Sequence, residues 1–300
     1  ADLNVSMQFK EDTYIPEGDV AVKISLTGLK GGHSGVDIHL GRANANKLMF
    51  RFLKEAVRDY GARLSSIDGG SLRNAIPREA FAIITIPGDN VEALWELVSD
   101  YQEMYRSEYK GIEHNINFTA EMTDMPVTLI PEEIQDDLIN AIEGCQNGVI
   151  SMLVDFPGTV ESSTNLAIVK SSNEMIEIQI LVRSSSESRK EAVCSSLESI
   201  FSLAGAKVEY SDGYGGWQPN IDSPILKIMQ QAYLDLYGKK PEAKVMHDGL
   251  ECGIIQESYP DMDMISIGPD LQHPHSPDER VSIPSVARTW DFIVTTLARI

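Results

Sequence analysis

Hydrophobic and polar residues alternate in a short run near the start of the chain. Large aliphatic side chains occupy every second position from Val20 to Leu26, which is the period of a half-buried β-strand. Apolar residues then recur at helical spacing from Leu48 to Ala56, and Gly61 follows them. This spacing predicts an amphipathic helix that ends at the glycine.

Further runs continue the pattern of strands and helices. Strand-like runs span Arg63–Ile67 and Ala80–Ile86, a second amphipathic helix covers Val91–Val98, and a last strand is expected near Ile112–Phe118. The resulting order, βαββαβ, is that of the split motif in ferredoxin-like folds. The sequence therefore predicts a ferredoxin-like α+β unit in the first part of the chain.

A partial repeat of this order follows. A helix-rich connection, Pro131–Glu143, precedes two strand-like runs, Asn165–Val169 and Met175–Val182, a helix from Val193 to Ala204, and a strand at Lys207–Tyr210. The repeat predicts that the α+β unit is partly duplicated. Turn chemistry around asparagine would produce a similar likeness between two hairpins, so that alternative stays open.

The composition changes at Gly213–Pro219, a segment of glycine and aromatic residues. The remaining chain alternates helices with two expected strands, Ala243–Met246 and Met262–Ile267, and ends in an amphipathic helix from Val286 to Leu297. So few buried strands do not make a stable sheet with both faces covered. We therefore expect this tail to belong to a larger α/β sheet.

Charge and cysteine content narrow the function classes. A formal net charge of -20 disfavours binding to nucleic acid or to anionic membrane surfaces. Cys145, Cys194 and Cys252 are widely spaced and form no C-x-x-C pair, which favours a reducing, cytoplasmic location. No apolar run reaches the roughly 18 residues that a membrane span requires.

The first candidate for chemistry is His33, in the glycine-rich turn Lys30-Gly-Gly-His-Ser-Gly35. A histidine here is suited to donate a hydrogen bond to a carbonyl oxygen that gains negative charge. A phosphate cradle is the alternative, but the G-x-x-x-x-G-K-[ST] spacing is missing. A Ser-His-Asp arrangement is not indicated, because neighbours such as His33 and Ser34 need not face each other.

A second group of candidates lies in loops of the tail. His273 and His275 stand among prolines and carboxylates after an expected strand, where imidazole suits zinc, although one loop supplies at most two of the three or so protein ligands that a catalytic zinc needs. In Met246–Gly253, His247 and Glu251 are candidates for substrate binding or proton transfer. The alternative for His275 is a structural or merely exposed loop histidine. The alternative for Met246–Gly253 is a glycine-punctuated turn without a chemical role.

Two residues of the expected second repeat complete the set. Arg183 closes a strand and has the geometry to bind a carboxylate with two hydrogen bonds. Asn165 stands in another strand-like run. The alternative for Arg183 is an exposed, solvated charge at a strand end. The alternative for Asn165 is a plain turn residue.

Several long motifs together resemble the aminoacyl-histidine dipeptidases, also called Xaa-His dipeptidases or peptidase D, of the di-zinc aminoacylase and carboxypeptidase superfamily. The resemblance runs from end to end of the chain. It is carried by Gly28-Leu-Lys-Gly-Gly-His-Ser-Gly35, Gly41-Arg-Ala-Asn-Ala-Asn-Lys47, Gly69-Gly-Ser-Leu-Arg-Asn-Ala-Ile-Pro-Arg-Glu-Ala80, Gly216-Trp-Gln-Pro219, His247-Asp-Gly-Leu-Glu-Cys-Gly253 and Pro260-Asp-Met-Asp-Met-Ile-Ser-Ile-Gly-Pro269.

The resemblance implies zinc-dependent hydrolysis of dipeptides with C-terminal histidine, with two zinc ions sharing a water and a glutamate as general base. It implies that His33 polarises the scissile carbonyl and that His275 is a zinc ligand. It further implies that Arg183 and Asn165 hold the substrate's carboxylate, and that Gly249–Gly253 lines the site.

The resemblance also implies a division of the chain. Residues 1–18 would be a connecting segment, and residues 19–212 would form a lid or dimerisation-type domain. Residues 213–300 would be the C-terminal part of an α/β zinc-peptidase catalytic domain.

The family's remaining zinc ligands and general base do not occur in the sequence, since no histidine precedes His33. We therefore expect the C-terminal portion of a dipeptidase, which binds zinc poorly and is inactive alone. A homodimer is among the expected assemblies. The alternatives are a non-catalytic dimerisation or peptide-binding module, and a compact metal site formed by His273, His275 and Asp278.

Overall fold

The structure is a computed structural model that describes residues 1–154, 156–211, 213, 220, 222–245, 251–272 and 279–300. The chain divides into two compact units, which are described separately. The first is built from Ala1–Gly213, and the second takes most of the residues beyond it. None of the helices in these described ranges is long and apolar enough to cross a membrane.

The first unit combines strands and helices of ordinary length. Its strands are β1 (Asp2–Gln8), β2 (Asp19–Thr27), β3 (Gly32–His33), β4 (Arg63–Gly69), β5 (Ala75–Ile76), β6 (Ala80–Pro87), β7 (Asn117–Met122), β8 (Gly148–Met152), β9 (Val160–Ser172), β10 (Met175–Ser184) and β11 (Lys207–Ser211). Its helices are the short 3₁₀ turns η1 (Ile38–Leu40) and η2 (Gly88–Asn90) and the α-helices α1 (Ala45–Tyr60), α2 (Val91–Glu108), α3 (Glu132–Gly144) and α4 (Glu187–Leu203).

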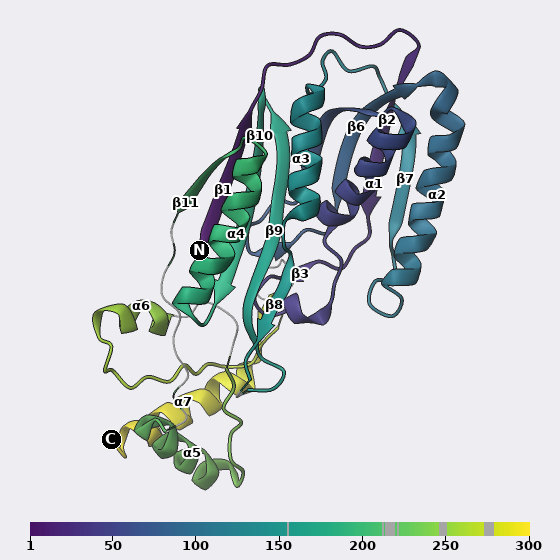
Figure 1. Ribbon diagram of the computed structural model, residues 1–300. Coiled ribbons are helices and arrows are strands. Elements are labelled where there is room, and N and C mark those ends of the chain that lie inside the picture. Colours follow the sequence, from purple (N-terminus) through teal and green to yellow (C-terminus); the bar gives the residue numbers. More distant parts are fainter. Residues whose placement is uncertain (155, 212, 214–219, 221, 246–250, 273–278) are drawn as a thin grey trace. The chain divides into compact units, whose positions relative to one another are not determined.

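A large antiparallel sheet carries this unit. Among the described residues nine strands join in it, eight of them in the order β11-β1-β10-β9-β4-β6-β2-β7, while β8 pairs with β9 beside that path. Helices α1 to α4 lie against one face of the sheet (Figure 1). The separate two-stranded ladder β3-β5 brings Gly32–His33 beside Ala75–Ile76.

Local sequence explains the elements around the sheet. The alternation in β2 buries Val22, Ile24 and Leu26 completely, as its period predicts. Helix α1 begins at Asn44, whose side chain accepts hydrogen bonds from the backbone amides of the first turn, and it ends at Gly61 in the left-handed conformation.

The sheet consists of two halves with the same order of elements. The first half runs β2-α1-β4-β6-α2-β7 and has the strand order β4-β6-β2-β7. The second half uses β1, then α3-β9-β10-α4-β11, and has the equivalent strand order β9-β10-β1-β11. The first half is therefore inserted into the second, and β4 pairs with β9 where the halves meet.

The expectation that residues 1–18 only connect is wrong for the first part of that segment. Residues Asp2–Gln8 form β1, which pairs with β10 on one side and β11 on the other. Leu3, Val5 and Met7 point into the core with at most 2% exposed surface, because every second residue faces the helices.

The last strand of the first half also differs from the prediction. It begins at Asn117 rather than near Ile112, because Ile112 and Glu113 donate their backbone amides to Tyr109 in a turn that follows α2.

The second unit contains α5 (Pro224–Tyr237), α6 (Glu251–Ser258) and α7 (Ile283–Leu297), with a two-stranded ladder of β12 (Leu271–Gln272) and β13 (Arg280–Val281). Met229 and Ala232 of α5 bury a small core with Phe292 of α7. The expected strand Met262–Ile267 is not formed, because no described strand lies beside it to complete a ladder. Residues 243–245 of the other expected strand are irregular, and Met246 lies outside the described residues.

If β1 is an integral strand, shortening a side chain on its buried face will destabilise the first unit. We expect Leu3→Ala to lower the free energy of unfolding by about 2–5 kcal/mol, the cost of a buried leucine cavity. Urea unfolding followed by circular dichroism measures this. Tyr14→Ala is the control, since Tyr14 is 68% exposed in the same segment; equal stability of both variants would contradict the assignment.

Thiol reactivity offers a second check on the core. Burial raises the pKa of the Cys145 thiol to about 11 and also raises the pKa of Cys194, so little reactive thiolate forms at either site near pH 8. Cys252, in α6, is half-buried. Titration with a thiol reagent should therefore give one fast cysteine in the native chain and three after denaturation, and a Cys252→Ser variant should lose the fast phase.

Candidate substrate-binding site

The His33 loop follows β2 and is fastened to the segment before β6. In the β3-β5 ladder His33 pairs with Ala75 and Gly32 with Ile76. The backbone amide of the next residue, Ser34, donates to the carbonyl oxygen of Asn74 at 2.8 Å. The loop is thus held as a short strand rather than left as an open turn.

The His33 side chain folds back onto its own loop. Its Nδ1 accepts hydrogen bonds from the backbone amides of Gly35 at 3.1 Å and Val36 at 3.2 Å. The η1 turn follows directly and buries Ile38. One ring nitrogen is therefore committed to local structure.

The structure brings Arg183 to this loop from the second half of the sheet. Arg183 stands near the end of β10 and is half-buried. Its Nη2 donates to the hydroxyl oxygen of Ser34 at 3.4 Å, and the Ser34 side chain is buried. A cationic group and the histidine loop, 150 residues apart in sequence, are therefore neighbours.

Asn165 reaches the same place from β9. Its side-chain amide donates to the carbonyl oxygens of Ala75 at 2.8 Å and Arg73 at 3.2 Å. Ala75 is the residue that pairs with His33. The Oδ1 atom of Asn165 is buried and has no hydrogen-bond partner among the described residues. The side chain thus supports the His33 ladder and retains one buried acceptor.

The first part of β9 is polar yet buried, which sequence periodicity did not reveal. The five residues Glu161–Asn165 are each no more than 8% exposed. Glu161 accepts hydrogen bonds from Ser151 and Arg189, and the hydroxyl of Ser162 donates to that of Ser184 at 2.8 Å. Buried polar groups need such partners. The signal available in the sequence was a run of polar residues within a strand-like segment.

Most of the remaining predicted site residues lie in parts of the chain that the structure does not describe. His247, Gly249 and His275 lie outside the described residues. Glu251 is the exposed first residue of α6 in the second unit. Among the described residues no group of three or more histidines, cysteines or carboxylates could hold a metal ion, so these residues do not fit a zinc site.

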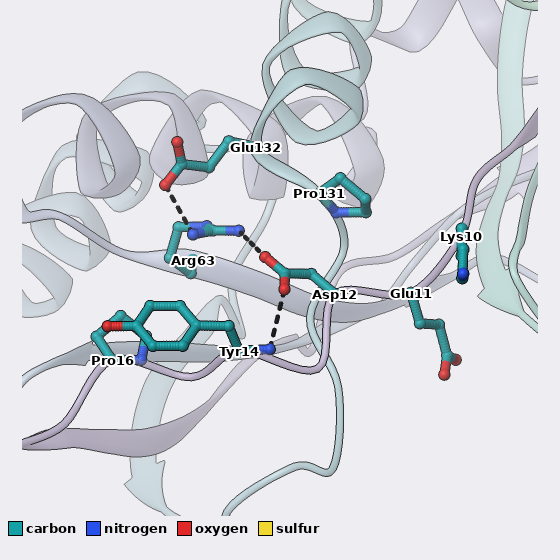
Figure 2. Close-up of a pocket in the computed structure, with 8 residues that line it drawn as sticks. All are labelled: Lys10, Glu11, Asp12, Tyr14, Pro16, Arg63, Pro131 and Glu132. Atoms are coloured by element: carbon teal, nitrogen blue, oxygen red, sulfur yellow. Dashed lines mark hydrogen bonds and ion pairs between the residues drawn. The ribbon is translucent and has the colours of Figure 1, made fainter.

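An open hollow of about 560 Å³ lies elsewhere on the first unit (Figure 2). Its lining includes Arg63, which forms ion pairs with Glu132 at 2.7 Å and Asp12 at 3.5 Å. The backbone amide of Tyr14 also donates to Asp12, at 2.9 Å. Because Arg63 is already paired with two carboxylates and the lining contains no predicted site residue, this hollow is not the candidate site.

Comparisons with known proteins agree with the motifs. Residues 24–113 match the peptidase dimerisation domain. The chain is 41% identical over 286 residues to the cytosol non-specific dipeptidase of Escherichia coli (strain K12), covering 95% of this chain and 59% of that protein. The crystal structure of the aminoacylhistidine dipeptidase from Vibrio alginolyticus matches with a TM-score of 0.88 and 41% identity, over 100% of this chain and 61% of that one.

Nearly the whole chain is therefore similar in sequence and in fold to these dipeptidases. This confirms the resemblance that the sequence motifs indicated. The chain spans about three fifths of the length of the relatives it matches.

Removing the Asn165 side chain should loosen the ladder that carries His33. In Asn165→Ala two partly buried carbonyl oxygens lose this donor, which costs about 1–3 kcal/mol locally. We expect faster hydrogen exchange at the Ser34 amide, measured by NMR or mass spectrometry. Asn117→Ala is the control, because that side chain makes a single exposed hydrogen bond to Thr27; equal acceleration at Ser34 in both variants would refute a local role.

Proposed function

We propose that the complete protein hydrolyses dipeptides with C-terminal histidine, such as carnosine-like Xaa-His substrates, and that this chain supplies its ferredoxin-like lid and the C-terminal part of its catalytic domain. The observation that carries the proposal is the hydrogen bond from Arg183 to Ser34, the residue next to His33. It supports the proposal because a guanidinium, which is suited to bind a carboxylate, lies beside the loop of a histidine that is suited to donate to a carbonyl.

The closeness of these two groups favours cleavage of the C-terminal peptide bond, which in a dipeptide is the single peptide bond. There the C-terminal carboxylate and the scissile carbonyl belong to adjacent residues, whose Cα atoms are about 3.8 Å apart. Groups that bind the two must therefore also be near neighbours. Cleavage at an interior bond of a longer peptide would place the C-terminal carboxylate farther from the scissile carbonyl.

Each residue then has a distinct task. Arg183 binds the substrate carboxylate with its planar guanidinium, which fixes the position of the peptide. His33 donates a hydrogen bond to the scissile carbonyl oxygen as negative charge develops there. Asn165 supports the strand opposite His33 and presents its buried acceptor. Glu251, Gly249 and His247 are proposed to bind the substrate as well.

Zinc is part of the proposal for the complete protein, with His275 as one ligand. A bound zinc ion would polarise the carbonyl and generate a nucleophile from water. Because the described residues do not fit a zinc site, the roles assigned to His33 and Arg183 involve no metal. Because one expected ligand, His275, is too few to hold and activate a metal-bound water, we propose that this chain alone is inactive.

The second unit supports the idea that more polypeptide completes the catalytic domain. Helix α7 exposes large apolar side chains, with Ile283 81%, Trp290 66% and Leu297 66% exposed. Large apolar residues that are this exposed on one helix are typical of a face that packs against another part of a protein. We propose that the rest of the catalytic domain covers this face.

We also propose a homodimer in the cytoplasm. The match of residues 24–113 to a peptidase dimerisation domain supports self-association, and the name of the Escherichia coli relative supports the location. The outer strands β7 and β11 end the eight-stranded path of the sheet, and unpaired strand edges favour pairing between copies.

The central experiment compares this 300-residue chain with the product of its full reading frame. We expect the longer protein to contain about two zinc ions by elemental analysis and to cleave β-alanyl-histidine, while the short chain does neither. Activity of the short chain alone would overturn the proposed site. Cleavage of β-alanyl-histidine and β-alanyl-alanine at equal rates would overturn the proposed preference for C-terminal histidine.

Two variants of the longer protein separate the proposed roles. His33→Gln should lower kcat by about 10²–10³, the usual cost of losing one donor to a developing oxyanion. Arg183→Lys should mainly raise KM, and it should reduce the preference for the free dipeptide acid over its C-terminal amide. Arg189→Lys is the matched control, because that arginine pairs with Glu161 rather than with the His33 loop.

A further inference from the structure

We infer that the loop around His33 fixes this histidine as the tautomer that carries its proton on Nε2, and that Asp37 and Arg42 are the positioning residues that hold it there. The functional meaning of this inference rests on the proposed function, because an Nε2 donor matters for catalysis where a substrate carbonyl reaches it. The tautomer itself is a property of this chain.

The hydrogen bonds to Nδ1 decide the tautomer. The amides of Gly35 and Val36 both point their protons at Nδ1, at 3.1 and 3.2 Å. A nitrogen that accepts hydrogen bonds must offer its lone pair, and a neutral imidazole has one donor and one acceptor nitrogen. The ring proton is therefore on Nε2. His33 is then a donor on its outer side, which is the form that stabilises an oxyanion.

Asp37 and Arg42 hold the backbone that makes this arrangement. The His33 amide donates to Oδ2 of Asp37 at 2.9 Å, and the Asp37 amide donates back to the His33 carbonyl oxygen at 2.8 Å. Arg42 Nη1 donates to the Gly31 carbonyl oxygen at 2.6 Å and lies 3.2 Å from Asp37 Oδ2. Both side chains are less than a quarter exposed, so solvent screens the pair less than it would an exposed one.

The positions of Asp37 and Arg42 also explain why the residue before His33 is a glycine. Gly32 has a φ angle of +139°, which L side chains rarely adopt. A Cβ atom at this position would collide with Nη1 of Arg42 and Oδ2 of Asp37. The space that a side chain would need is occupied by the two groups that hold His33, so glycine is required there.

A second carboxylate fastens the outer ends of the loop. Glu113, which is 4% exposed, accepts the amide of Lys30 at 2.8 Å and the amide of Ala43 at 3.1 Å. These residues flank the segment that contains His33, Asp37 and Arg42. The loop is therefore closed at its base by Glu113 and shaped at its tip by the Asp37–Arg42 pair.

Nitrogen NMR of this chain, labelled with ¹⁵N-histidine and studied at pH 8, tests the inference without any catalytic assay. The His33 signals are assigned from their loss in His33→Gln. We expect Nδ1 to resonate in the range of an unprotonated ring nitrogen and Nε2 in the range of an N–H. Signals that place the proton on Nδ1, or averaged signals from both tautomers, would overturn the inference.

Variants show whether the named residues are responsible. Asp37→Ala should move both His33 nitrogen signals toward averaged positions, and Asp37→Asn should restore much of the difference, since its Oδ1 can still accept the His33 amide. Asp68→Ala is the control, because Asp68 forms an exposed pair with Lys170. Signals unchanged in Asp37→Ala would remove the positioning role.

A second pair of variants changes one of the amide donors to Nδ1. It tests the inference even if Asp37→Ala does not fold. Val36→Pro removes one amide proton, whereas Val36→Ala keeps it; Val36 is 44% exposed. The proline variant alone should shift the Nδ1 signal toward the N–H range. Equal signals in the two variants would contradict the assigned hydrogen bond.

Hydrolysis by the longer protein distinguishes this inference from the proposed function. Asp37→Ala should lower kcat while KM changes by less than about twofold, because the substrate carboxylate is bound elsewhere. If wild-type protein showed the Nε2–H tautomer but cleaved no dipeptide, the proposed function would fail and the tautomer assignment would stand.

Discussion

The pairing of β4 with β9 is the constraint on which the first unit depends. It joins two halves that have the same order of elements into one sheet, through Asp68 with Lys170 and Gly69 with Val169. Helix α1 seals this seam, because the side-chain amides of Asn44 and Asn46 both donate to the Leu166 carbonyl oxygen. A Cβ atom on Gly70 would collide with the Ala167 carbonyl oxygen, so the close approach of the two halves also requires a glycine.

The seam is what assembles the candidate site. His33 comes from the loop that follows β2 in the first half, whereas Asn165 and Arg183 come from β9 and β10 of the second half. The groups proposed to bind the scissile carbonyl and the substrate carboxylate therefore come from different halves. The site therefore forms once the long-range pairing is complete, and it depends on contacts between residues 90 to 149 positions apart in sequence, which are costly to form during folding.

Sequence patterns predicted those parts of the fold that depend on local periodicity. The alternation in β2, the apolar spacing of α1 and the glycine after it each determine an element largely by themselves. The strand character of Asp2–Gln8 was visible as alternation of Leu3 and Val5 with polar neighbours, but the strand is stabilised by β10 and β11, far along the chain. The expected strand Met262–Ile267 is not formed, although its local pattern is strand-like, because no described strand lies beside it to pair with.

The difference between local sequence patterns and long-range contacts also decides which parts of the candidate site were predictable. His33 was identifiable because glycines surround it, and Arg183 because it ends an apolar strand. The roles of Asp37, Arg42 and Glu113 were not predictable, because each acts through a backbone hydrogen bond whose partner sequence spacing does not reveal. The buried polar run in β9 had a signal in its composition, but its meaning depends on which strands cover it.

The two halves differ most in the segment that follows their first strand. In the first half this segment holds His33 in a glycine-rich loop. In the second half it contains Asp12, whose backbone pairs with Leu129 and whose carboxylate meets Arg63 (Figure 2). The ion pairs of Arg63 neutralise that region and fasten it to α3 through Glu132. The two halves thus have two equivalent positions, of which one secures the insertion of the first half and the other holds the His33 loop beside Arg183 of the second half.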